Sequence, residues 1–230
     1  MPAFLKDITR FYGTGEKNKA GQSLEEFLEN YDPYKYRTPS CTVDTVLFSC
    51  GTTLTKELRE MQILLVKRSN HPSIGCWALP GGFVDLEENL EDAARRELRE
   101  ETGVEDLPME QIATYGDYDR DPRTRVITTV YMALVQEQEP DVHAGDDAAD
   151  ALWCRVALEE TDKKENRRNC RLHIWNREKG LDTCASVEHI WQKGLICHES
   201  FRVTEPGMIA VDHAAIIVQA LTILQERCGR

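Results

Sequence analysis

Apolar and polar residues alternate along several short runs in the middle of the chain. Residues 42–49 alternate valine, threonine and leucine, and residues 62–67 form a run rich in leucine and valine. Both patterns are typical of β-strands. By the same reasoning, further strands are predicted at residues 76–79, 111–118, 126–136 and 151–156. We therefore expect a sheet built from the middle of the chain.

Three segments show the period of a helix instead. Residues 23–31 predict a short amphipathic helix, and residues 212–225 predict a longer one with an aliphatic face. Between them, residues 89–102 contain strong helix formers, with Asn89 placed to cap the first turn and Gly103 placed to end the helix. Its predicted apolar face carries Leu90, Ala93, Ala94 and Leu98. Strands flanked by two such helices indicate an α/β fold.

Acidic residues interrupt this apolar face. At about 100° per residue, Glu97 and Glu101 fall in its middle, one turn apart, and Glu100 lies at its edge. A buried carboxylate is costly unless something compensates it, and hard cations such as Mg²⁺ and Mn²⁺ prefer oxygen ligands. The pattern therefore predicts a metal site, and the alternative is a solvated acidic helix.

The same acids belong to a longer motif, Gly-x5-Glu-x7-Arg-Glu-Leu-x-Glu-Glu-x-Gly-Val, that runs from Gly82 to Val104. This motif is similar to the Nudix box of Nudix hydrolases at every defining position. Other segments resemble the ADP-ribose pyrophosphatase-like branch of that family: residues 31–44, 65–68, 77–83, 120–123, 145–148 and 211–214, together with Trp153. The resemblance implies a Nudix α-β-α sandwich that cleaves pyrophosphates with Mg²⁺ or Mn²⁺.

The resemblance also implies roles for individual residues. Glu97, Glu100, Glu101 and the carbonyl oxygen of Gly81 would bind the metal. Arg96 would orient Glu97 and Glu88, although an ordinary surface ion pair between Arg96 and Glu88 is the alternative. The two glycines permit a tight turn that brings the backbone close to the metal and the phosphate. The catalytic base is left open between a glutamate of the box and a loop carboxylate, for which the candidates are Asp146, Asp147 and Asp150.

Basic and aromatic residues near the motif are candidates for substrate binding. Arginine suits bidentate contact with phosphate, which makes Arg68, Arg120 and Arg123 candidates, with surface ion pairs as the alternative. Gly82 and Phe83 would also contact the substrate. Trp77 and Phe83 are able to stack on a base, but Trp77 is expected in the core.

The resemblance leaves two segments uncovered. We expect residues 1–40 to form a helical extension and residues 41–230 to form the Nudix domain, with a β-rich insertion at about residues 160–206. In that insertion a charged run at residues 163–168 predicts a solvated loop, and residues 171–175 and 187–191 predict a hairpin around Gly180. The insertion also contains a group of thiols and imidazoles whose spacing fits no standard zinc pattern, so free thiols are favoured over a zinc site: Cys170, His173, Cys184, His189, Cys197 and His198.

Composition restricts the choice of partners. The net charge of −12 argues against nucleic acid and anionic membranes, because phosphate binding needs a basic surface. With neither a membrane-length apolar run nor a signal-peptide core, the 230-residue chain is expected to be cytoplasmic, and its eight cysteines reduced. A homodimer is a further expectation.

The favoured function is metal-dependent hydrolysis of ADP-ribose to AMP and ribose 5-phosphate. One alternative is a non-catalytic sensor of ADP-ribose or a sugar nucleotide, but the intact box and the end of the chain just after the last helix argue for the enzyme. Another alternative keeps the chemistry and changes the substrate to an oxidised nucleotide or a dinucleoside polyphosphate.

Overall fold

The computed structural model describes residues 4–51, 54, 58, 60–136, 140–142 and 148–228. The chain divides into two compact units, Met1–Thr38 and Pro39–Arg230, and each is described by itself. The first unit contains a 3-10 helix, η1 (Thr9–Phe11), and the short helix α1 (Leu24–Asn30), neither of which has a buried residue. Ser23 and Glu26 form a capping box at the start of α1, so the helix predicted at residues 23–31 is confirmed.

The second unit is built on one mixed sheet with the strand order β10-β9-β8-β7-β2-β1-β6-β5. The pair β1–β6 is parallel and the other pairs along this path are antiparallel. Two short strands lie off this path, with β3 pairing β2 and β4 pairing β1. The strands are β1 (Ser40–Cys50), β2 (Gln62–Arg68), β3 (Trp77–Ala78), β4 (Gly81–Phe83), β5 (Glu110–Tyr115), β6 (Val126–Gln136), β7 (Ala148–Lys164), β8 (Arg167–Asn176), β9 (Leu181–Gln192) and β10 (His198–Glu205).

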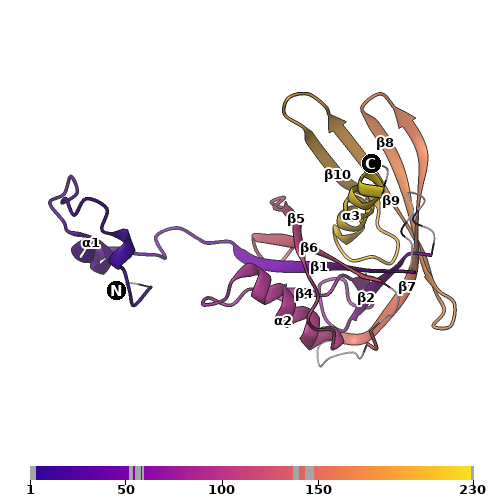
Figure 1. Cartoon of the computed structure of the whole chain (residues 1–230), viewed down its shortest axis with the longest axis horizontal. Helices are drawn as coiled ribbons and strands as arrows, with labels where there is room; N and C mark the ends of the chain where they lie inside the picture. The colour runs from indigo at the N-terminus through magenta and orange to yellow at the C-terminus, as the bar shows by residue number, and fades with distance from the viewer. Residues whose placement is uncertain are drawn as a thin grey trace. The chain divides into compact units, whose positions relative to one another are not determined.

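Helices cover both faces of the sheet (Figure 1). Because side chains alternate along a strand, Val46 and Phe48 of β1 join the core cluster under helix α3 (His213–Cys228), whereas Leu47 joins a cluster with Leu98 of helix α2 (Leu90–Thr102). Residues 43–50 are buried throughout, as expected for a strand covered on both faces. The predicted α-β-α sandwich is confirmed.

Helix α2 begins and ends as predicted, but two details of the prediction are wrong. Asn89 occupies the N-cap position, yet its side chain accepts no backbone hydrogen bond and instead donates to Asp92. Leu90, expected on the apolar face, is exposed, whereas Ala93, Ala94 and Leu98 are buried. Gly103 ends the helix in the left-handed region with φ of +76°, where glycine carries no Cβ penalty.

The segment before α3 departs further from prediction. Strand β7 extends well beyond residues 151–156 and pairs with β8 through residues 155–164, so the insertion continues the main sheet. Residues 163–168 were expected to form a solvated loop, and this is wrong: Lys163 and Lys164 end β7, while Arg167 and Arg168 begin β8. The predicted hairpin is confirmed, since β8 and β9 pair antiparallel and Gly180 lies in the connecting turn at φ of +68°.

No helix in the described part of the chain is both long enough and apolar enough to cross a membrane.

Candidate functional site

Arg96 is the centre of an ion-pair network on α2. Its Nε and Nη2 donate to the two carboxylate oxygens of Glu88, each at 2.9 Å. Its Nη1 donates to Glu97 at 2.8 Å and to Glu100 at 3.1 Å, and its Nη2 also reaches the carbonyl oxygen of Phe83 at 3.0 Å. The Arg96, Glu88 and Glu97 side chains are mostly buried, and that of Glu100 is half exposed. One arginine thus ties three box acids to the turn that precedes the helix.

The glycine pair of that turn lies against the backbone and the acids. A Cβ on Gly81 would lie 2.1 Å from the carbonyl oxygen of Val43, and a Cβ on Gly82 would lie 2.5 Å from the Glu97 carboxylate carbon. The amide of Gly81 donates to Glu101 at 2.9 Å. Strand β4 pairs with β1, so this close approach follows from the sheet register. Only glycine fits these two positions without displacing a neighbour.

Burial raises the pKa values of both inward acids. Desolvation raises the pKa of Glu97 above its ordinary value, opposed by the hydrogen bond from Arg96. For Glu101, burial raises the pKa to about 7, opposed by the amide of Gly81 and reinforced by the charges of Glu97 and Asp44. Both carboxylates are therefore held where their negative charge is costly, which is a condition that a bound cation relieves.

The residues at this point fit a hard divalent cation. The available donors are oxygens only: the carboxylates of Glu97, Glu100 and Glu101 and the backbone carbonyl group of Gly81. In the described residues, however, no three acidic, histidine or cysteine side chains are already gathered around one point. Glu97 and Glu100 are turned toward Arg96, so binding an ion would require these side chains to reorient.

A second wall contains residues for which the sequence prediction gave no role. Asp44 of β1 is buried, and its Oδ2 accepts a hydrogen bond from Thr128 at 2.7 Å. The Nε2 of His213 lies 3.7 Å from the Oδ1 of Asp44. The Nδ1 of His213 accepts from the amide of Leu79 at 2.8 Å, so the proton of the neutral ring is on Nε2. Both residues lie in segments that resemble the ADP-ribose pyrophosphatase-like branch, residues 31–44 and 211–214, but the sequence alone gave neither of them a role.

The three arginines predicted to bind substrate all line one cleft, but their side chains are engaged differently. Arg120 is buried and donates from Nε and Nη2 to Asp212 at 2.8 and 2.9 Å, so it serves first as a structural ion pair. Arg123 is half exposed and pairs with Asp121. Arg68 donates from Nε to the carbonyl oxygen of Pro72 at 2.7 Å.

The cleft has a volume of about 520 Å³, in the range of small-molecule sites. It brings together residues from both walls: Asp44, Arg68, Gly81, Gly82, Phe83, Arg96, Glu97, Glu101, Arg120, Arg123 and His213. Glu88 and Glu100 are connected to the cleft by hydrogen bonds from Arg96, which lines it. Trp77 is buried in the core as expected, and Phe83 is half exposed. Asp147 lies outside the described residues.

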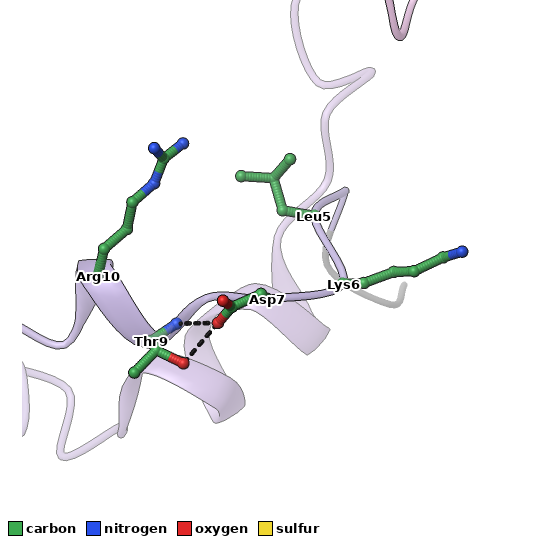
Figure 2. A pocket seen from close by; sticks show the side chains of 5 residues that line it. All are labelled: Leu5, Lys6, Asp7, Thr9 and Arg10. Carbon is green, nitrogen blue, oxygen red and sulfur yellow. Dashed lines mark hydrogen bonds between the residues drawn. The ribbon is translucent and has the colours of Figure 1, made fainter.

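The N-terminal unit has a hollow of its own, lined by Leu5, Lys6, Asp7, Thr9 and Arg10 (Figure 2). The carboxylate of Asp7 accepts from the amide and the hydroxyl of Thr9, which lowers its pKa. Its acid is thus engaged in a local turn, and we place the functional site in the cleft of the second unit.

In the described residues, the thiols and imidazoles of the insertion do not gather into a group of three or more around one point. Cys170 and His189 are buried, whereas Cys184 is half buried and Cys197 is exposed. Cys170 and His173 lie three positions apart on one strand, so they point to opposite faces. All eight cysteines are free thiols.

Comparisons with known proteins agree with this geometry. A family model described as NUDIX domain matches residues 27–172. The ADP-ribose-responsive transcriptional repressor NtrR of Acinetobacter baylyi is 44% identical over 49% of this chain and 44% of its own length, so the chain spans less than half of that relative. The ADP-ribose pyrophosphatase of Methanocaldococcus jannaschii is 38% identical over 55% of this chain and 70% of its own.

Solved structures give the same picture. A MutT/nudix family protein from Enterococcus faecalis is 31% identical, with a TM-score of 0.65, over 89% of this chain and 70% of that chain. The NUDIX domain of Shewanella oneidensis NrtR, solved as a complex with ADP-ribose, is 29% identical, with a TM-score of 0.58, over 88% of this chain and 99% of that domain.

Proposed function

The chain belongs to the Nudix family, and from this premise we propose that it is a divalent-metal-dependent hydrolase that cleaves ADP-ribose to AMP and ribose 5-phosphate. Members of the family generally use divalent metal ions. The observation that carries the proposal is the partly buried acid cluster of α2, which Arg96 ties to strand β4 in the lining of the cleft.

Glu97, Glu100, Glu101 and the Gly81 carbonyl oxygen would hold Mg²⁺ or Mn²⁺. When bound, the cation neutralises phosphate oxygens, polarises phosphorus and lowers the pKa of a coordinated water. Arg96 fixes the orientation of Glu97 and Glu88, and the missing side chain of Gly82 allows the Glu97 carboxylate to lie directly against the backbone of β4. We do not assign the catalytic base, because Asp147 lies outside the described residues and Asp150 is bonded locally to the amide of Ala151.

The choice of ADP-ribose rests on the named relatives, one of which is an ADP-ribose pyrophosphatase and another an NrtR domain with ADP-ribose bound. We further propose that the chain binds no nucleic acid, on the basis of its net charge of −12, and that it forms a homodimer.

A second candidate function is supported by the 44% identity to a transcriptional repressor that responds to ADP-ribose. In this alternative, the cleft binds ADP-ribose without cleaving it. The intact acid cluster favours the enzyme, because binding alone does not require three acids beside a cation site.

The test is hydrolysis of ADP-ribose in Mg²⁺ and Mn²⁺, with AMP and ribose 5-phosphate identified by chromatography. Glu97→Gln and Glu101→Gln should each lower turnover by at least about 100-fold, because each removes a charge needed to hold the metal. The unfolding free energy of Glu101→Gln should be unchanged or slightly higher, because burial disfavours the carboxylate and the glutamine oxygen still accepts from Gly81, whereas Glu97→Gln loses its ion pair with Arg96 and should be somewhat less stable.

Glu91→Gln is the matched control, because Glu91 lies on the same helix but is exposed and pairs with Arg95. It should retain wild-type turnover. Turnover by the Glu97 or Glu101 variants at the wild-type rate in saturating Mg²⁺ would refute the site. Tight binding of ADP-ribose by the wild type without cleavage would support the sensor instead.

A further inference from the structure

Phe83 and Arg123 face one another in the cleft. The Cζ of Arg123 lies 5.4 Å from the centroid of the Phe83 ring, within the range of a cation–π contact. They come from β4 and from the loop between β5 and β6, and both line the cleft. Phe83 is 46% exposed and the Arg123 side chain 47% exposed. Two flat groups from different parts of the chain thus form one partly open stack.

The charge of Arg123 is already matched. Its Nη2 donates to the Oδ2 of Asp121 at 2.8 Å and its Nε donates to Oδ1 at 3.1 Å. The backbone amide of Arg123 also donates to Oδ1 at 2.9 Å, so Asp121 holds both the main chain and the side chain. Asp121 therefore occupies the Nε–Nη2 edge of the guanidinium group, which is one of the two edges able to form a bidentate contact with a phosphate. The flat face of the guanidinium group lies toward the Phe83 ring.

Phe83 is held equally firmly. Its carbonyl oxygen accepts from the Nη2 of Arg96, and its backbone pairs with Thr42 in the sheet. Phe83 directly follows Gly82 in the chain, so its Cα atom lies about 3.8 Å from the Cα atom of Gly82, beside which the phosphate is expected. A nucleotide with its phosphate at that turn has its ribose and base within reach of the ring.

We propose that Phe83 and Arg123 form a stacking platform for the aromatic base of a nucleotide, and that Arg123 recognises the base and not a phosphate. This inference rests on the proposed function, because it assigns the nucleoside end of that substrate to one side of the cleft. Stacking tolerates different bases, so the platform selects for an aromatic base without fixing which one.

The experiment uses AMP and ribose 5-phosphate as probes, since both carry a ribose and a phosphate but only AMP carries a base. Their dissociation constants are measured by calorimetry in Mg²⁺ with the full chain, and neither probe is cleaved. Phe83→Leu keeps an apolar side chain without the ring, and Arg123→Lys keeps the charge without the flat group. Each variant should raise the dissociation constant of AMP about 5- to 10-fold and leave that of ribose 5-phosphate within about 2-fold of the wild type, because loss of base stacking accounts for roughly the first factor.

Arg227→Lys is the matched control, because Arg227 is also half exposed and paired with a carboxylate through two nitrogens, but binds Glu110 outside the cleft. It should leave the dissociation constants of both probes unchanged, and Phe83→Trp should keep AMP binding at the wild-type level. Equal losses for both probes in Arg123→Lys would show a phosphate contact and overturn the proposal. So would unchanged AMP binding in both variants, or a wild type that binds AMP no better than ribose 5-phosphate. These outcomes are independent of whether ADP-ribose is hydrolysed.

Discussion

At the scale of single residues, the two glycines of the turn have different neighbours and therefore predict different losses. The nearest atom to a Cβ on Gly81 belongs to the backbone of β1, which cannot move without disturbing the sheet. The nearest atoms to a Cβ on Gly82 belong to the Glu97 carboxylate, the far end of a flexible side chain. We expect Gly81→Ala to lower the free energy of unfolding by more than about 2 kcal/mol, the size of other overpacking changes.

Gly82→Ala should instead leave stability within about 1 kcal/mol and lower turnover strongly, because it displaces Glu97 from its position. Urea unfolding and steady-state hydrolysis of ADP-ribose measure the two effects. Gly116→Ala is a suitable control, since a Cβ there would make only ordinary contact with Ile127. The explanation fails if Gly82→Ala unfolds the protein as readily as Gly81→Ala.

The helical wheel predicted which acids turn inward, because the spacing of Glu97 and Glu101 fixes their face on any regular helix. The wheel could not reveal what each arginine contacts. Arg120 looked like a phosphate ligand beside Arg123, but Asp212, which holds it, lies far away in the sequence. Long-range partners of this kind follow from the tertiary fold and not from local spacing.

At the scale of elements, strands β8, β9 and β10 are linked to α3 through a buried polar group. Arg168 of β8 donates to the Nδ1 of His189 at 3.0 Å, to Thr222 of α3 at 3.0 Å and to Glu160 of β7. His189 is buried, and the ring of Phe201 stacks on it at 4.1 Å. These contacts explain why Arg168 lies within a strand, since its charge is compensated inside the fold, and why only residues 165–166 of the charged run form a turn.

This arrangement predicts a loss of stability in mild acid. Burial and the charge of Arg168 lower the pKa of His189 from 6.5 to about 4, although Glu160 opposes the shift. Above pH 6.5 the ring is neutral in both states and contributes no dependence on pH. As the pH falls from 6.5 toward 4, only the unfolded chain takes up the proton, so the free energy of unfolding should fall by about 2–3 kcal/mol through this group.

Chemical unfolding at a series of pH values measures the effect. His189→Phe keeps a ring against Phe201 but cannot bind a proton, so its stability should depend less steeply on pH in that window. The raised pKa of Glu101 acts on stability in the opposite direction, but Glu101 is present in both proteins. The difference between their stability curves therefore isolates the contribution of His189. Replacing the exposed His198 with glutamine should leave the wild-type slope unchanged. Parallel curves for His189→Phe and wild type would contradict the prediction.

At the scale of the whole molecule, the architecture follows from two signals in the sequence. Alternation along residues 42–49, 62–67 and 126–136 defined the strands of the central sheet, and the period of residues 89–102 and 212–225 defined its two covering helices. The joining of β8–β10 to the same sheet was not predictable: the alternation of β8 and β9 predicts a hairpin, but it does not identify the strand with which that hairpin pairs. Pairing with a neighbouring strand, and not local preference, decides the structure there.

The shape of the cleft leads to the last prediction, which concerns substrate choice. The loop after β2, with Arg68 and Pro72, lines the same cleft as the pair Phe83–Arg123 and the acids of α2. A substrate with a group on each side of its pyrophosphate is able to contact both sets of residues, whereas a nucleoside triphosphate has a nucleoside at one end only. We therefore expect a higher kcat/KM for ADP-ribose than for ATP, because binding energy from the second ribose is available only to the two-headed substrate.

Arg68→Ala should lower kcat/KM for ADP-ribose and leave that for ATP nearly unchanged, with Arg227→Ala as the control outside the cleft. A wild type that prefers ATP would contradict the substrate assignment while leaving the metal site intact, since the metal site contacts only the pyrophosphate that both substrates share.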